Sequence, residues 1–267
     1  MSAFAYSDRR LVNGPEISVP PIDIGVNNNV KSLLVEKKRI DGRQFSQPRP
    51  IFVKTGIVKK AAGSAYLEQG NIKISCTIDG PRQIKKAGVL VSSTVGNFEC
   101  EFKFASFSTS WRKVNHKDTE ERDISAIITQ AIGPSICLHM FPKSLITANV
   151  TVVESDGRMA TIAAAIKCIS VALIDASIDM YDLTTCTSAS LIDEQWVIDC
   201  NQLEENEESV SLLISSMSSA QEITHIIQTG KTNTDQTQQG ISKCLDANTK
   251  IHKTVLEFLA AESIDAL

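Results

Sequence analysis

Residues 63–82 read GSAYLEQGNIKISCTIDGPR, and this stretch decides the fold. From Ile72 to Ile78 apolar and polar residues alternate strictly, which is the period-2 pattern of a β-strand. Glycines punctuate the residues before this strand, and Gly80-Pro81 follows it, so both ends indicate turns. The stretch therefore predicts a β-hairpin.

Three further runs are rich in β-branched and aromatic residues and predict short strands at residues 51–58, 89–95 and 98–104. In residues 98–104 apolar and charged side chains alternate, which is typical of a half-buried antiparallel strand. Four strands in succession predict a meander.

A helix is expected after these strands. Asp118 is its predicted N-cap, and Glu121 stands three residues further on, at the spacing of a capping box. Gly133-Pro134 ends or kinks the helix. Apolar residues recur between these signals at the spacing of one helix face, at Ile124, Ile127, Ile128, Ala131 and Ile132.

The remaining chain continues in blocks. A strand over residues 145–153, a turn at Asp156-Gly157 and an apolar helix up to about residue 176 complete a first βαβα half. Strands at residues 183–192, 196–199, 210–217 and 223–228, a polar loop at 232–239 and an amphipathic C-terminal helix repeat the arrangement. The predicted fold class is α+β, with two βαβα halves and helices packed on one face of mixed or antiparallel sheets.

The first 48 residues differ from the rest in composition. They hold Pro15, Pro20 and Pro21, three consecutive asparagines, and basic residues at Lys37-Lys38-Arg39 and Arg43. Such a composition buries little apolar surface. We therefore expect residues 1–48 to form an extended arm over a surface or a partner, and residues 49–267 to form the folded domain.

Overall composition indicates an ordinary globular protein, with 42% apolar and 22% charged residues. The net charge of −4 does not favour nucleic-acid binding by the whole molecule, so any RNA contact requires a local basic patch. The most apolar run, residues 161–176, contains Lys167 and Asp175 and is too short for a membrane span. We expect no membrane association, and the N-terminus has no apolar run of secretory length.

The seven cysteines lack the spacing of a zinc site, and the four histidines stand alone, so we expect no bound metal and no histidine-dependent catalysis. An odd number of cysteines indicates a reducing compartment. The acidic run at residues 204–208 lacks the glycine and oxygen-ligand spacing of a calcium loop and is expected to be solvated.

An ordered series of short elements carries a family resemblance. The series is Arg49-Pro50, residues 63–82, Phe141-Pro142-Lys143, Asp156-Gly157 and Ala172-Leu173-Ile174-Asp175-Ala176. Together these resemble the RNase PH family of 3′-end RNA phosphorolases, and in particular the RNase PH-type subunits of the eukaryotic RNA exosome core. The resemblance covers residues 50–260 approximately and implies a fold of two βαβα halves.

The N-terminal segment narrows the subunit type. Asp8-Arg9-Arg10-Leu11 and Gly14-Pro15-Glu16 resemble the mRNA-transport-regulator type of exosome subunit. Asp41-Gly42-Arg43 before the first strand is also common in other RNase PH-like exosome subunits, so those types stay open.

The resemblance also implies where an active site would lie. In active members two carboxylates six positions apart follow a segment that residues 197–201 resemble, which places them at Glu205 and Ser211. A serine hydroxyl cannot replace a carboxylate as metal ligand or general acid. Paired arginines before the first helix correspond to Glu121 and Arg122, and an anion beside a phosphate site is repulsive. We therefore expect a degenerate former active site at Arg122, Glu205 and Ser211, without catalytic residues.

Two basic segments resemble the loops that line the neck of the exosome channel. They carry Arg82, Lys85 and Lys86, and Arg112, Lys113 and Lys117. The resemblance implies that these side chains hold the phosphate backbone of single-stranded RNA, although a charged run is also typical of a solvated loop.

Three hypotheses follow. The first is a non-catalytic subunit of a hexameric exosome ring, beside paralogous RNase PH-like subunits and cap subunits with oligonucleotide-binding folds, which guides RNA in the nucleus, nucleolus and cytoplasm. It requires no cofactor. The second is a phosphate-dependent 3′-exoribonuclease, alone or with a composite site, in which Arg122 and Glu205 survive. The third is a small-molecule-binding protein, which requires a buried apolar pocket.

Overall fold

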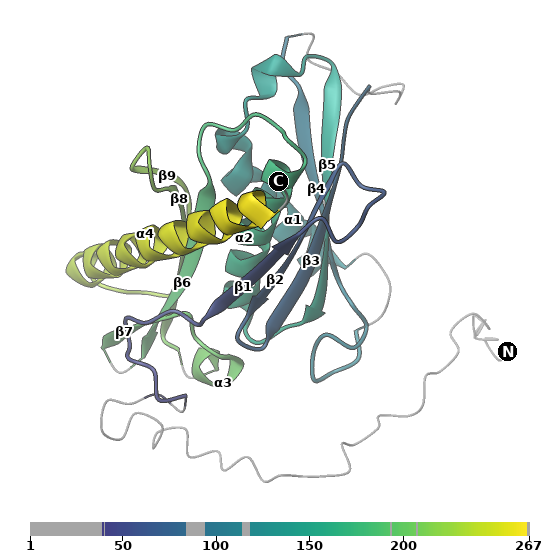
Figure 1. Ribbon diagram of the computed structural model, residues 1–267. Helices are drawn as coiled ribbons and strands as arrows, with labels where there is room; N and C mark the ends of the chain where they lie inside the picture. The colour runs from purple at the N-terminus through teal and green to yellow at the C-terminus, as the bar shows by residue number, and fades with distance from the viewer. Residues whose placement is uncertain are drawn as a thin grey trace, which may run out of the picture.

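Two β-sheets enclose two helices, and a third long helix covers the outer side of one sheet (Figure 1). The computed structural model describes residue 39 and residues 41–83, 94–113, 118–192, 194–206 and 208–265. Side chains of the last helix are described as far as residue 261.

The first sheet has five strands in the order β1-β2-β3-β5-β4. The strands are β1 (Ile51–Thr55), β2 (Gly63–Gln69), β3 (Ile72–Gln83), β4 (Asn97–Phe104) and β5 (Ser144–Glu154). The predicted hairpin is confirmed, because β2 and β3 pair in antiparallel register around Gly70. The side chains of β3 alternate between buried and half-buried from Ile72 to Asp79, as the sequence pattern predicted.

The predicted meander is confirmed for β1, β2 and β3, which pair in chain order, and is wrong for β4. β4 pairs with β5, and the two strands run parallel rather than antiparallel. The reason is the helix between them, since a crossover through a helix returns the chain in its original direction. The alternating burial predicted for residues 98–104 is confirmed, because an edge strand buries one face whichever way its neighbour runs. Of the strand predicted at 89–95, residues 89–93 lie outside the described residues, and residues 94–95 form a bend.

Helix α1 (Thr119–Ile132) begins where the sequence predicted. The Asp118 carboxylate accepts a hydrogen bond from the backbone N–H of Thr119 at 2.7 Å. The Glu121 carboxylate accepts instead from the backbone N–H of Phe104 at 3.0 Å, and so ties α1 to the end of β4. A 3₁₀ turn at Gly133–Ser135 ends the helix, and a second 3₁₀ turn, Leu138–Met140, precedes β5.

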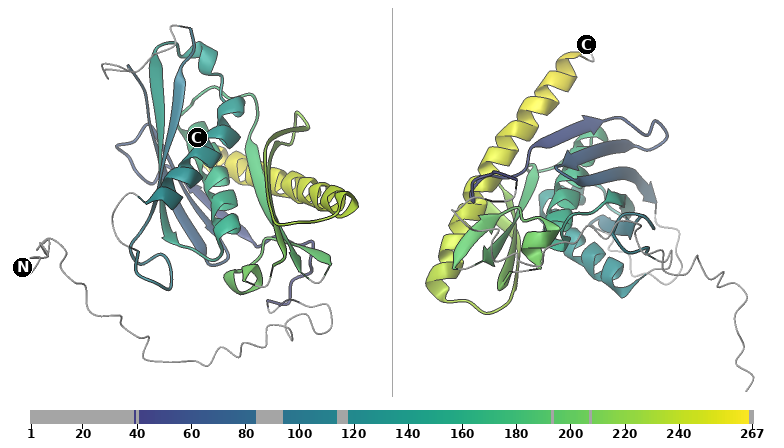
Figure 2. Two further views of the ribbon diagram at one scale, coloured as in Figure 1. Left: turned by 180° about the vertical axis from the view of Figure 1, so that it is seen from behind. Right: turned by 90° about the horizontal axis from the view of Figure 1, so that it is seen from below.

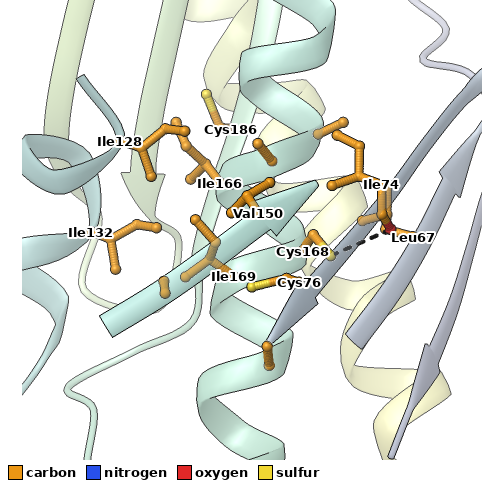
Figure 3. Packing of buried hydrophobic residues seen from close by; sticks show 14 of the residues in the cluster. Leu67, Ile74, Cys76, Ile128, Ile132, Val150, Ile166, Cys168, Ile169 and Cys186 are labelled. Carbon is orange, nitrogen blue, oxygen red and sulfur yellow. Dashed lines mark hydrogen bonds between the residues drawn. The ribbon is translucent and has the colours of Figure 1, made fainter. Parts of the chain in front are cut away.

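Helix α2 (Arg158–Asp175) is buried on nearly all sides because it lies between the two sheets. Figure 3 shows Ile166, Cys168 and Ile169 of this helix among side chains from both sheets and from α1. An all-round apolar sequence is the pattern of such an interior helix. The interior helix predicted up to about residue 176 is therefore confirmed.

The second sheet has four antiparallel strands in the order β7-β6-β8-β9. They are β6 (Thr184–Ile192), β7 (Gln195–Ile198), β8 (Val210–Met217) and β9 (Glu222–Thr229), and the single turn α3 (Gln202–Glu205) stands between β7 and β8. Every residue of β6 and β8 is buried. Helices therefore cover both faces of this sheet, and the expectation of helices on one face is wrong (Figure 2).

The covering helix on the outer face is α4 (Thr234–Asp265), which begins within the polar segment predicted as a loop. Trp196 of β7 anchors the first turn of α4, because its indole N–H donates to the carbonyl of Gln236 at 2.8 Å. Gly240 lies directly on the Trp196 ring, since a Cβ there would come within 2.8 Å of ring carbons. The first turn of α4 consists of polar residues, so it carries no hydrophobic periodicity. The sequence pattern therefore did not predict it as helix.

The described part of the predicted N-terminal arm lies against the second half of the domain. Phe45 packs beside Ile192, Val197 and Cys200, and the N–H of Ile198 donates to its carbonyl at 2.9 Å. Residues 1–38 and 40 lie outside the described residues.

Gly63 marks the tightest contact between the first sheet and α2, and it yields a testable prediction. A Cβ at this position would lie 2.3 Å from the nitrogen of Ala176 and 2.5 Å from the carbonyl oxygen of Ala172. We expect Gly63→Ala to lower the free energy of unfolding by about 1–3 kcal/mol, because the backbone of strand or helix must shift. Urea denaturation followed by circular dichroism measures the change.

Gly133→Ala is the matched control, because this glycine has helical angles and open space around its Cα. We expect it to change stability by less than about 1 kcal/mol, because the added methyl group meets no other part of the fold and only its neighbour Pro134 opposes it. Equal destabilisation by both substitutions would contradict the close approach of β2 to α2.

Candidate former active site

A pocket of about 290 Å³ lies at the end of the first sheet where β4 stops and α2 begins. The residues that give it chemical character are Lys113, Glu120, Gly157, Arg158, Gln202 and Glu205. They come from the β4–α1 loop, the first turns of α1 and α2, and the α3 turn. Charged side chains line this pocket, unlike the buried apolar pocket that the small-molecule hypothesis requires.

Glu205 occupies the N-terminus of α2. Its carboxylate accepts hydrogen bonds from the backbone N–H groups of Arg158 at 2.5 Å and Met159 at 3.3 Å. Gly157 makes this approach possible, since a Cβ there would lie 2.7 Å from a Glu205 oxygen. Free N–H groups at a helix N-terminus bind anions, and here the chain supplies the anion itself. Burial raises the pKa of Glu205, and the two backbone hydrogen bonds oppose that rise.

The two cations of the pocket share one carboxylate. Lys113 Nζ lies 3.1 Å from Glu120 Oε2, and Arg158 Nε lies 3.6 Å from Glu120 Oε1. The Lys113 ammonium also lies 3.7 Å from the centre of the Phe104 ring, a cation–π contact. With Glu205 included, the pocket holds two positive and two negative side chains, so it has no surplus positive charge for a phosphate.

Arg39 holds the α3 turn from the other side. Its guanidinium, whose side chain is fully buried, makes a two-pronged contact with Glu204 at 2.8 and 2.5 Å and donates to the carbonyls of Ile198 and Asp199, each at 2.8 Å. Paired contacts of this kind between arginine and a carboxylate are strong and directional. Glu204 is thus buried, and the expected solvated loop at residues 204–208 is wrong for Glu204 and Glu205.

A second buried ion pair joins the start of β1 to the end of β7. The Asp199 carboxylate accepts from the Arg49 guanidinium at 2.7 Å, from the Arg49 backbone N–H at 2.8 Å and from Gln69 at 2.7 Å. Arg49 also reaches Asp156 at 3.2 Å. Burial would raise the pKa of Asp199, but the Arg49 charge and hydrogen bonds, with the Lys167 charge, hold it below its usual value.

Lys167 completes this buried network from the middle of α2. Its ammonium is fully buried and donates to the side-chain oxygen of Gln69. Burial lowers the pKa of Lys167 to about 8. Sequence patterns did not identify this network. Lys167 inside an apolar helix and Arg49 before the first strand were the available signals.

The structure does not bring together the three residues of the expected former active site. Glu205 lies in the pocket, whereas Arg122 lines a separate groove between β4 and α1. Ser211 is buried within β8, where its register partners are Ser190 and Thr229.

The candidate RNA-binding residues fall at opposite ends of the first sheet. Arg82 is exposed near the end of β3, opposite Leu145 of β5, and pairs with Asp79 at 3.2 Å. The segment with Arg112 and Lys113 follows Phe104, which pairs with Val152. Seven residues of strand separate these levels, or roughly 23 Å. Lys85, Lys86 and Lys117 lie outside the described residues.

Within the described residues, no helix is both long and apolar enough to cross a membrane. Among the same residues, no three histidine, cysteine or acidic side chains lie together as a metal site would require.

The first sheet with α1 and α2 is the part of the fold that a protein-family model matches. The model of the 3′ exoribonuclease family, domain 1, matches residues 47–179. The exosome complex component mtr3 of Schizosaccharomyces pombe is 36% identical over 244 residues, which cover 90% of each chain. The exosome complex component RRP41-like of Arabidopsis thaliana is 36% identical over 83% of this chain and 84% of its own.

A solved structure agrees with the fold. An Archaeoglobus fulgidus exosome with RNA bound to the active site superposes with a TM-score of 0.74 at 14% identity, covering 85% of this chain and 96% of that one. The chain belongs to the RNase PH family of 3′ exoribonucleases. Its similarity to the mtr3 component confirms the predicted resemblance to that subunit type.

The Arg49–Asp199 pair yields a second prediction. Because the pKa of Asp199 is lower in the folded chain than the unfolded value of about 4, the pair stabilises the fold above pH 4 and this contribution is lost as pH falls below it. We expect Asp199→Asn to cost about 3–5 kcal/mol at pH 7, because the buried Arg49 loses its nearest counter-charge and keeps only the longer contact with Asp156 at 3.2 Å. The pH dependence of the unfolding free energy between pH 5 and 2 should be shallower than in the parent protein.

Glu154→Gln serves as the control for this experiment. Glu154 pairs with Lys73 at 2.8 Å on the surface, where both side chains are at least 40% exposed. We expect a change below about 1 kcal/mol. A similar loss in both variants at pH 7 would argue against a special role for Asp199.

Proposed function

We propose that this chain is a non-catalytic RNase PH-fold subunit of an RNA exosome core ring, with structural and RNA-guiding roles in 3′–5′ RNA processing and decay. Similarity over nine-tenths of its length to an exosome complex component supports the assembly role. The observation that carries the non-catalytic part is the Glu205 carboxylate on the α2 backbone N–H groups.

Phosphorolysis needs inorganic phosphate held beside the scissile bond by N–H groups and arginines, with carboxylates for a metal ion and for proton transfer. In this chain Glu205 takes the N–H groups, and Glu120 neutralises Lys113 and Arg158. A bound phosphate would have to displace one carboxylate and approach another. The expected second acid position, Ser211, supplies only a hydroxyl within a strand.

The sheet edges support the proposed assembly with paralogous subunits. β9 is an edge strand, and its Ile223 and Ile226 are each more than 40% exposed. β1 is an edge of the other sheet, and its Phe52 is half exposed. Unpaired strand edges with apolar side chains favour pairing with another chain. Ring neighbours would cover these edges, and cap subunits with oligonucleotide-binding folds would complete the complex.

Single-stranded RNA is the proposed polymer that this complex guides. Exposed Arg82 and Arg112, on segments that leave opposite ends of the first sheet, would contact the backbone at two levels. A place in the nucleus, nucleolus and cytoplasm follows from the proposed function.

The alternative, an active phosphate-dependent 3′-exoribonuclease, needs Arg122 and Glu205 to act on one phosphodiester. They line different hollows in this chain, which favours the non-catalytic proposal. A composite site would require a partner subunit to supply an arginine in place of Glu121 and a carboxylate in place of Ser211.

The third prediction combines assembly with activity. Native mass spectrometry of the tagged chain purified from its source should detect a multi-subunit complex with one copy of this chain. This complex is then incubated with 3′-labelled RNA and inorganic phosphate. Any release of nucleoside diphosphates should be the same whether or not Glu205 is present. An active phosphorolase of the same family is the positive control, and omission of phosphate reveals hydrolysis.

The Glu205→Ala variant separates this chain from its partners in the same assay. Phosphorolysis that survives the substitution belongs to another subunit. Phosphorolysis that the substitution abolishes, with Glu154→Gln unchanged, would overturn the non-catalytic proposal. A monodisperse monomer or homo-oligomer would overturn the ring proposal.

A further inference from the structure

Two large aromatic side chains stand in solvent on the loop between β4 and α1. Phe107 and Trp111 are each 74% exposed, more than any other large apolar side chain in the described part of the chain. The other tryptophan of the protein, Trp196, is 2% exposed. Large aromatic rings at such exposure mark a contact surface, because their transfer into water is costly.

Backbone hydrogen bonds hold residues 105–113 of this loop. The N–H of Ser108 donates to Ala105 at 3.0 Å, and the N–H of Lys113 donates to Ser106 at 3.1 Å. The N–H of Ser155, just beyond β5, donates to the carbonyl of Ser108 at 2.9 Å and fixes the loop to the sheet. A loop that is already ordered loses little entropy when a ligand binds to it.

The surroundings of the two rings are polar and basic. Ser108, Thr109 and Ser110 separate them, the Thr109 hydroxyl donates to the carbonyl of Trp111 at 2.6 Å, and the exposed Arg112 follows. Within the described residues Arg112 forms no ion pair, whereas Lys113 is engaged by Glu120. Protein interfaces are also enriched in aromatic residues and arginine, but they are depleted of serine. Aromatic rings among hydroxyls and an arginine match single-stranded nucleic acid better, which offers a base face and a phosphate at every step.

We propose that Phe107 and Trp111 are stacking platforms for the bases of single-stranded RNA and that Arg112 contacts the adjacent phosphate. This proposal rests on the proposed RNA-guiding function. It adds Phe107 and Trp111, two uncharged residues that a search for basic side chains does not find. Stacking is tolerant of base identity, so the contact would hold RNA without selecting a sequence. Lys113 positions the loop through Phe104 and Glu120 and is not the primary RNA contact.

The first test uses tryptophan fluorescence of the full chain titrated with a 12-nucleotide single-stranded RNA. Trp111 should be quenched on stacking, whereas buried Trp196 should not respond. Fluorescence anisotropy of labelled RNA then measures affinity. We expect Trp111→Ala to weaken binding roughly 5- to 150-fold, as for the loss of one stacked base. Trp111→Phe should keep affinity within about 3-fold and lose the quenching.

Tyr181→Ala is the matched control. Tyr181 is 64% exposed and lies beside Ser135 and His139, near the start of β5 and so at the opposite end of the first sheet. We expect this substitution to leave RNA affinity unchanged. Equal weakening by Tyr181→Ala and Trp111→Ala would overturn the proposal.

Salt dependence separates stacking from charge. Arg112→Gln should reduce the slope of log affinity against log salt by about one, because one phosphate contact is lost. Trp111→Ala should lower affinity with the slope unchanged. A reduced slope for Trp111→Ala would contradict a stacking role.

If the isolated chain aggregates, ultraviolet cross-linking of RNA in the assembled complex tests the same contact. Trypsin releases residues 104–112 as one peptide, which contains both aromatic rings. We expect RNA-linked forms of this peptide. If no RNA-linked peptide is found and a neighbouring subunit shields Trp111, the RNA-stacking proposal is overturned and the ring proposal remains intact. RNA stacking in a chain that joins no complex would overturn the ring proposal alone.

Discussion

The buried ion pair between Arg49 and Asp199 fixes how the two halves of this protein meet, since it joins residues 150 positions apart. Burial of two charges costs several kcal/mol per ion, which the pair's attraction and hydrogen bonds offset only in good geometry. Asp199 meets that condition with three hydrogen bonds at 2.7–2.8 Å. By contrast, the five large apolar side chains buried from α2 contribute on the order of 10 kcal/mol, from Ile162, Ile166, Ile169, Val171 and Leu173. The core therefore supplies stability, and we infer that the pair supplies the relative position of the halves.

The former active site depends on the same network. Arg49 reaches Asp156 in the turn before α2, and Asp156 accepts a hydrogen bond from the N–H of Gln202 at 2.9 Å. Two neighbouring carboxylates of α3 then point in opposite directions, Glu204 towards Arg39 and Glu205 towards the N-terminus of α2. Residues from before the first strand thus help to hold the carboxylate that fills the anion position. The position of the Glu205 carboxylate is therefore a property of the packed fold and not of one side chain alone.

The sequence predicted the elements better than their arrangement. Alternation at residues 72–78 and the Asp118 cap are local signals, and the structure confirms both. The position of β4 beside β5 is not local, because the pattern of an edge strand does not reveal the direction of its neighbour. Burial of β6 on both faces was likewise hidden, since its small hydroxyl residues read as neither apolar nor exposed. At the site, counting residues found Glu205, but only the folded chain reveals which N–H groups its carboxylate accepts from.

The stability of the fold and the chemistry of the pocket can change independently in this protein, because different interactions support them. The contacts that close the pocket are single hydrogen bonds and part-exposed ion pairs, each worth about 1 kcal/mol. The five large apolar side chains of α2 together contribute on the order of 10 kcal/mol, more than these pocket contacts combined, and the core around them includes none of the charged side chains of the pocket. An RNase PH fold can therefore persist while the residues at the N-terminus of α2 change. Function in this family has to be argued from those residues and from exposed groups such as Trp111, since the shared fold does not distinguish an enzyme from a ring subunit.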